Sequence, residues 1–245
     1  DLGPGMSENV ARQFALAQDW SSLSQALAAR PVPGLKGQYW MGLALYRQGQ
    51  LQQSKPYLAQ AARSSASAFD EKKMAAHSLY LLSTEALKDY QSIQLGAGKN
   101  EAQLVKVKND KLSQLTAQFN KVISYGNGRW VIAALYQLGR ANNEFAQFIN
   151  GAAMPAGLNP AQQGQYKQLI AQQSQTFKQK AAGYFNSCVQ NAEKFEVFTN
   201  FVKGCLSQGA TEVDEAAEER TLAKAADSAP TEATAIRRKL LDTPR

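Results

Sequence analysis

The residues best able to do chemistry through sulfur are Cys188 and Cys205, the only cysteines in the chain. Both lie in segments with helical spacing, and their midpoint, at Glu196 and Val197, is where one helix should give way to the next. If the chain folds back there, the two thiols lie level on neighbouring helices. We therefore predict a disulfide, which is typical of oxidising compartments. Two separately buried thiols are the alternative.

The single histidine, His77, would have to serve in any Ser-His-Asp or Cys-His arrangement. It lies between Ala76 and Ser78 in a helical pattern, and no GxSxG motif accompanies it. We therefore expect His77 to be structural or on the surface. One histidine and two cysteines at this spacing match no zinc motif, and the sequence has no Walker A or GxGxxG loop. We expect no metal and no other cofactor.

Carboxylates from different helices could still do acid–base chemistry. The isolated ones are Glu71, Glu85, Glu144 and Glu196. We expect helix caps or surface charges at these positions, and we predict that the protein is not an enzyme. An acidic cluster lies near the C-terminus, and it is either a solvated helix face or a contact with the basic body. Its members are Glu212, Asp214, Glu215, Glu218 and Glu219.

The charge is unevenly distributed along the 245 residues. The formal net charge is +7, but residues 209–245 contain eight acidic and six basic residues, a net charge of −2. The preceding 208 residues therefore carry 21 basic and 12 acidic residues, a net charge of +9. A basic body is compatible with an anionic partner, although a solvated surface is the alternative. The basic residues are scattered and form no basic-aromatic motif, so we expect no nucleic-acid partner.

These residues must be positioned by helices, because Ala, Leu and Gln dominate and β-branched residues are sparse. We predict long helices over about 100–124 and about 160–194, and a short one over about 195–207. Asn159 followed by Pro160 is a strong helix start. Predicted breaks are Pro31 to Gly34, Gly96 to Gly98, Gly126 to Gly128, and Gly151 to Leu158.

No window of about 18 apolar residues occurs, so we expect no transmembrane helix. The sequence begins at Asp1 without Met and shows no signal peptide. These features are compatible with a mature form from which an export signal or a lipid anchor has been removed.

A three-residue turn recurs in the first ninety residues, at 18–20, 49–51 and 88–90, and each copy is predicted to join two helices. The spacings of 31 and 39 residues are close to those of helix-turn-helix repeats. The middle copy resembles the tetratricopeptide pattern: Met41-Gly42 stands at the usual Leu-Gly pair, Leu45 at the usual Tyr or Leu, and Ser54 at the usual small residue.

The resemblance implies a groove, because the first helix of each tetratricopeptide pair lines a concave surface. Mapped onto the middle copy, the groove positions are Lys36, Tyr39, Leu43, Tyr46 and Arg47. Two aromatic and two cationic side chains on one face suit an extended peptide with a carboxylate or an acidic side chain. In the alternative interpretation, the tyrosines pack between repeats and the two cations are solvated.

The stretch from Trp130 to Cys205 carries a second resemblance. Trp130 begins Trp-Val-Ile-Ala-Ala-Leu-Tyr-Gln-Leu-Gly, and Met154-Pro155, a Gln-rich helix and Phe185-Asn-Ser-Cys188 follow. This order resembles exported tetratricopeptide proteins of bacteria that glide on surfaces, where similar proteins belong to the envelope-spanning adventurous gliding-motility machinery. It implies scaffolding in the periplasm or at the outer membrane.

We therefore predict an all-α, tetratricopeptide-like solenoid that ends in a long-helix hairpin. Residues 1–95 form the repeats, 96–208 the longer helices and the hairpin, and 209–245 a weakly helical or extended tail. The predicted function is a non-catalytic protein-interaction scaffold of the bacterial envelope, with a protein or peptide partner. The alternative is a periplasmic protein that binds or cleaves peptidoglycan or another glycan.

Overall fold

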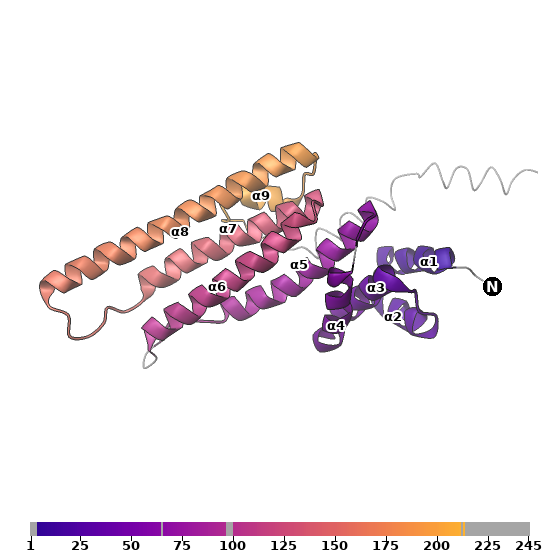
Figure 1. The fold of residues 1–245 in the computed structure, drawn as a ribbon, viewed down its shortest axis with the longest axis horizontal. Coiled ribbons are helices and arrows are strands. Elements are labelled where there is room, and N and C mark those ends of the chain that lie inside the picture. The colour runs from indigo at the N-terminus through magenta and orange to yellow at the C-terminus, as the bar shows by residue number, and fades with distance from the viewer. Residues whose placement is uncertain (1–3, 65, 97–99, 212, 214–245) are drawn as a thin grey trace, which may run out of the picture.

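The computed structural model describes residues 4–64, 66–96, 100–211 and 213, and these residues form nine helices and no strand. The predicted all-α class is confirmed. Figure 1 shows four short helices gathered at one end of four longer ones that run side by side. The short helices are α1 (Pro4–Leu16), α2 (Trp20–Ala29), α3 (Gly34–Arg47) and α4 (Leu51–Arg63). The others are α5 (Phe69–Gln91), α6 (Glu101–Ser124), α7 (Gly128–Gly151), α8 (Pro160–Phe195) and α9 (Asn200–Leu206).

Most predicted breaks lie between helices, and each has a local cause. The Asp19 carboxylate accepts a hydrogen bond from the backbone N–H of Ser22 and caps α2. Gly49 ends α3 with φ of 77°, a conformation that favours glycine. The Asn159 side chain caps α8 by accepting from the N–H of Gln162, as the Asn-Pro pair predicted. Of the break at Gly96 to Gly98, residues 97 and 98 lie outside the described residues.

The third predicted turn is wrong. Residues 88–90 form the last turn of α5, which runs unbroken for 23 residues. No glycine or proline occurs between Phe69 and Gln91, so nothing in this stretch interrupts the helix. The long α5 therefore replaces the pair of short helices that a third repeat would need.

The helices pack in chain order, each against the next, from α1 to α9. Odd-numbered helices also contact one another across the structure: α1 packs on α3, α3 on α5, α5 on α7, and α7 on α9. The even-numbered helices α2, α4, α6 and α8 each pack between two consecutive odd-numbered ones. Alternate helices thus form one continuous layer.

The hydrophobic interior consists of two clusters that meet in α5. The first contains α1 to α4 side chains and Met74, Ala75 and Leu81 of α5. The second contains Ala76, Tyr80 and other α5 residues, together with α6 to α9. Because successive positions on a helix face different directions, α5 contributes one face to each core. The division predicted at residue 95 stays a prediction.

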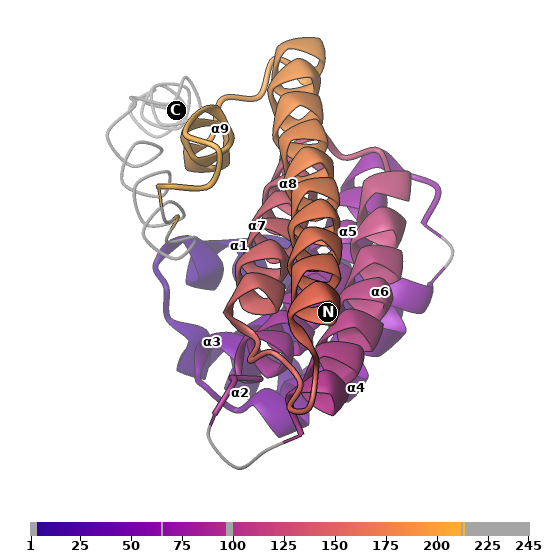
Figure 2. The same ribbon diagram turned by 90° about the vertical axis from the view of Figure 1, so that its left-hand side faces the viewer.

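A disulfide joins Cys188 on α8 to Cys205 on α9, as predicted. Both cysteines are fully buried. The second helix of this hairpin is shorter than the predicted 195–207, because α8 continues to Phe195 and Glu196 then adopts a left-handed conformation with φ of 54°. Figure 2 shows α9 beside α8, at the end where the two helices connect.

One large apolar side chain of α8, that of Leu169, is exposed. The α7 residue Asn150 donates to Ser174, whereas α8 begins fourteen residues earlier, at Pro160. The start of α8 therefore extends past the end of α7, and Leu169 in this overhang is 51% exposed. The glutamines of this Gln-rich helix are exposed as well.

Candidate functional site

A cavity of about 730 Å³ opens on the layer of odd-numbered helices, and we call it the groove. Its size falls in the range of small-ligand sites and also fits a few side chains of a bound peptide. The lining residues come from α1, α3, α5, α7 and the start of α2. They are Arg12, Ala15, Leu16, Gln18, Trp20, Tyr39, Trp40, Leu43, Tyr46, Arg47, Asp70, Lys73, Met74, His77, Arg129 and Trp130.

Four of the five predicted groove positions line this cavity: Tyr39, Leu43, Tyr46 and Arg47. Lys36 is on the same helix, half-buried, and is not among the lining residues. The two tyrosines also join helices, as the alternative interpretation expected. The Tyr46 hydroxyl donates to Glu85 of α5 at 2.9 Å, and Tyr39 reaches His77 of the same helix. Their binding role stays a prediction.

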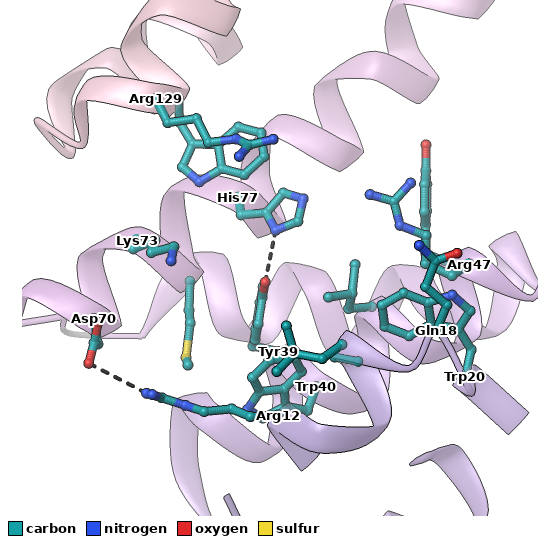
Figure 3. A pocket seen from close by; sticks show the side chains of 16 residues that line it. Arg12, Gln18, Trp20, Tyr39, Trp40, Arg47, Asp70, Lys73, His77 and Arg129 are labelled. Atoms are coloured by element: carbon teal, nitrogen blue, oxygen red, sulfur yellow. Dashed lines mark hydrogen bonds and ion pairs between the residues drawn. The ribbon is translucent and has the colours of Figure 1, made fainter. Parts of the chain in front are cut away.

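A chain of rings crosses the floor of the groove and connects three odd-numbered helices. The Tyr39 hydroxyl oxygen lies 2.9 Å from Nδ1 of His77 (Figure 3). The His77 ring in turn stacks on Trp130 of α7, with ring centroids 4.0 Å apart and planes 10° from parallel. His77 is buried, so the expectation of a structural histidine fits its position.

All three tryptophans of the chain, Trp20, Trp40 and Trp130, line the groove. Trp20 and Trp130 were missed because they lie outside the middle repeat, the only copy mapped onto the tetratricopeptide groove. Trp40 lies in that copy but was not among the mapped positions. A usable signal was present: Trp130 opens the helix that carries the second Leu-Gly pair, and Trp40 follows Tyr39 directly.

Positive charge predominates on the described lining, which contains one carboxylate, that of Asp70, and four cationic side chains, those of Arg12, Arg47, Lys73 and Arg129. Arg12 and Asp70 form an ion pair at 3.6 Å with both side chains about half exposed, so water screens their attraction. In Figure 3, these two residues and Lys73 lie on one side of the Tyr39–His77 pair, and Arg47 lies on the other. The guanidinium of Arg129 lies 5.3 Å from the Trp130 ring centroid, within cation–π range.

The isolated carboxylates considered for acid–base chemistry lie elsewhere. Glu71 accepts hydrogen bonds from the backbone N–H groups of Ser67 and Ala68, which lower the pKa of its carboxyl group and cap α5. Glu144 pairs with Lys108 between α7 and α6. Glu85 lies between Tyr46 and Lys88, and Glu196 ends α8. None of the four belongs to the described lining.

The described part of the chain contains no group of three or more His, Cys, Asp or Glu side chains that could hold a metal ion. Of the predicted acidic cluster, Glu212, Asp214, Glu215, Glu218 and Glu219 lie outside the described residues. Among the helices that are described, none combines the length and hydropathy needed to cross a membrane.

Comparison with protein-family models, with curated proteins and with solved structures finds no match to this chain. Its fold and groove therefore have to be interpreted from their own chemistry.

Proposed function

We propose that the protein is a non-catalytic interaction scaffold that binds an acidic segment of a partner protein in the groove. The main support for this proposal is that four helices, α1, α3, α5 and α7, contribute side chains to the lining of one cavity although they are far apart in sequence. A surface built from many helices can follow an extended peptide over several residues, as concave solenoid surfaces do.

The contacts between alternate helices support a tetratricopeptide-like solenoid. In such a solenoid, the first helices of successive pairs pack against one another and line the concave side, while the second helices form the outer layer. Here α1, α3, α5 and α7 pack in succession and contribute most of the groove lining, and α9 packs on α7 without contributing to the lining. The helix lengths, from 7 to 36 residues, depart from a regular repeat, so the proposed solenoid is irregular.

The lining chemistry supports an acidic partner segment. Arg47, Lys73 and Arg129 can each donate to a carboxylate, and an arginine can do so through two parallel N–H groups. The flat faces of Trp20, Trp40 and Tyr46 can cover apolar or aromatic side chains of the same segment. Recognition of this kind fixes both the charge and the spacing of the bound residues.

We place this scaffold outside the cytoplasm. A disulfide between buried cysteines supports an oxidising compartment. Together with the resemblance to exported proteins of gliding machineries, it favours the periplasm or the outer membrane of a bacterium. More specifically, we propose that the scaffold belongs to a gliding-type complex.

Glycan binding is the second candidate, and the aromatic lining favours it, because sugar rings stack on Trp and Tyr faces. A basic groove would also suit anionic peptidoglycan. Cleavage requires two carboxylates on either side of the scissile bond. The described lining contains one, Asp70, and it is engaged with Arg12, so the geometry favours binding over cleavage.

Capture from an envelope extract tests the groove. The wild type is compared with an Arg47→Glu/Arg129→Glu variant and with a control of equal charge change on even-numbered helices, Lys55→Glu/Lys178→Glu. We expect the control to retain the captured proteins and the groove variant to lose them. An acidic peptide should displace these proteins, and the same peptide with its Glu and Asp replaced by Gln and Asn should not.

Two results would contradict the proposal. Equal capture by the groove variant, with an unchanged circular dichroism spectrum and melting curve, would show that the groove does not bind the partner. Sedimentation of wild type but not of groove variant with purified peptidoglycan, without any captured protein, would establish the glycan alternative.

A further inference from the structure

We propose that the acidic stretch 212–219 of this chain binds in its own groove and competes there with the partner. This inference rests on the proposed function, because it concerns regulation of the same site. These residues lie outside the described part of the chain, except Val213, and their charge follows from the sequence.

The first argument is charge complementarity. Five of the eight residues from 212 to 219 are acidic and none is basic. The described lining of the groove has the opposite excess, with four cationic side chains and one carboxylate. Arg47 and Arg129 lie far apart in sequence but contribute to one cavity, so an acidic segment there would face cations from several helices. Field lines concentrate in a concave basic site and favour such a ligand.

The second argument is where the described chain leads. The Tyr136 hydroxyl on α7 donates to the carbonyl oxygen of Thr211 at 2.7 Å, and Val213 packs against the second core. Arg129 lies seven residues before Tyr136 on the same helix, about 10 Å along its axis. The four residues that follow Thr211, up to and including Glu215, can span up to about 14 Å. The acidic stretch therefore begins within reach of the groove.

The third argument is that α9, the helix that precedes the acidic stretch, packs on α7, which carries the groove residues Arg129 and Trp130. Phe201 of α9 packs against Tyr136 and Tyr80, with ring centroids 5.7 and 6.3 Å away. Tyr80 in turn lies 5.0 Å from Trp130, which lines the groove. The helix that precedes the acidic stretch is thus joined to the groove wall through a continuous set of rings.

Tethering makes even a weak interaction effective. A short linker gives an effective concentration in the millimolar range, so a segment with a dissociation constant of about 0.1 mM occupies the site roughly nine-tenths of the time. A partner then binds about tenfold more weakly than it would to the vacant groove. A partner that makes more contacts with the groove than the acidic stretch does would still displace it. The acidic stretch would therefore select for partners that bind tightly.

Tryptophan fluorescence is a direct readout, because all three tryptophans line the groove. A synthetic peptide of residues 212–219 is titrated into the full chain and into the full-length variant Glu215→Gln/Glu218→Gln/Glu219→Gln. The control variant Asp227→Asn/Glu232→Gln/Asp242→Asn removes the same charge elsewhere in the C-terminal segment. We expect the peptide to bind the first variant about tenfold more tightly than the wild type or the control.

Each other outcome overturns the inference. Equal affinities for the three proteins would mean that the acidic stretch does not occupy the groove, and no binding to any of them would mean that the groove does not accept it. Capture by the groove variant is scored separately: if that variant loses its partners while the peptide affinities stay equal, the scaffold function holds and the self-competition fails.

Discussion

The two hydrophobic cores of this protein differ in what their helices surround. The first core is formed by α1 to α4 and part of α5, and the hydroxyl groups of Tyr39 and Tyr46 are among the groups that join these helices beside the groove. Around the second, longer helices enclose a disulfide and a buried lysine. Most residues that line the groove come from the first region, and the second region contributes Arg129 and Trp130 of α7.

The comparison shows how one helix can serve both regions. On α5, Met74 belongs to the first core, Tyr80 to the second, and His77 lies between them in the groove. The stacked His77 and Trp130 rings therefore connect α5 to α7 at the groove.

Removing the buried lysine should have the largest effect. Lys108 is 1% exposed, and its ammonium group donates to Glu144 at 2.7 Å and to the Ile93 carbonyl at 3.0 Å. It also lies 4.5 Å from the centroids of the Tyr90 and Phe148 rings. Breaking a buried ion pair at one partner costs about 3–5 kcal/mol. Because Glu144 is 30% exposed and can still be hydrated, Lys108→Met should lower the free energy of unfolding by the lower part of that range.

The matched control for this variant is Lys106→Met, which breaks an exposed ion pair with Asp110 on the same helix. Pairs of this kind contribute about 0–1 kcal/mol. Urea unfolding followed by circular dichroism measures both variants. Similar losses for the two lysines would mean that the Lys108 pair does not stabilise the second region.

The disulfide is the next largest contribution. It closes a loop with a sequence separation of 17, for which the chain-entropy model gives about 3 kcal/mol. We expect Cys188→Ala/Cys205→Ala to lose about that much stability, and amide hydrogen exchange to speed up most in α8 and α9. An equal increase in the amide exchange rate in α2 to α4 would show that the two regions unfold as one unit, which would contradict the distinction between them.

Two glycines at Leu-Gly or Met-Gly pairs allow the packing of the regions to be compared. A Cβ on Gly139 would overlap the fully buried ring of Phe185, whereas one on Gly42 would meet the buried Leu58 side chain at 2.8 Å and the Leu58 backbone nitrogen at 3.0 Å, a smaller overlap. Overpacking costs about 1–3 kcal/mol, and a flexible leucine yields more readily than a ring. We expect thermal melting to show a larger loss for Gly139→Ala than for Gly42→Ala, and the reverse order would contradict this picture of the second core.

The sequence predicted most of the helices because their ends carry local signals, such as Asn159 before Pro160 and Gly49 after α3. It also predicted the disulfide, from two helical segments around one turn. The continuity of α5 was missed although a local signal was present, because the spacing of the repeat turns was given more weight than the absence of glycine and proline between Phe69 and Gln91. The exposure of Leu169 has no local signal, because it depends on how helices of unequal length align, which is a tertiary property. The sequence identified only groove residues that lie on α3. Arg129 and Lys73 reach the same cavity only through the packing of α7 and α5, which the sequence did not predict.

Acidification should give the smallest effect, and it should distinguish the regions by their helix caps. In the first region, the pKa of Asp19 is lowered by hydrogen bonds from the hydroxyl and the backbone N–H of Ser22, and that of Glu71 by backbone N–H groups. In the second, the caps of α6 and α8 are Asn100 and Asn159, which do not titrate. The side-chain caps of α2 and α5 can therefore be protonated in acid, whereas those of α6 and α8 cannot.

The sign follows from the lowered pKa values. A carboxyl group whose folded pKa lies below its ordinary value, 3.8 for Asp19 and 4.5 for Glu71, stabilises the fold above that value and loses this contribution as the pH falls through the folded pKa. Amide exchange, corrected for its intrinsic rate, should therefore accelerate below about pH 4 in the first turns of α2 and α5 before those of α6 and α8. Asp19→Asn and Glu71→Gln should remove this difference, since an amide keeps an acceptor oxygen without titrating. If α6 and α8 open at the same pH as α2 and α5, the carboxylate caps are not what separates the two regions in acid.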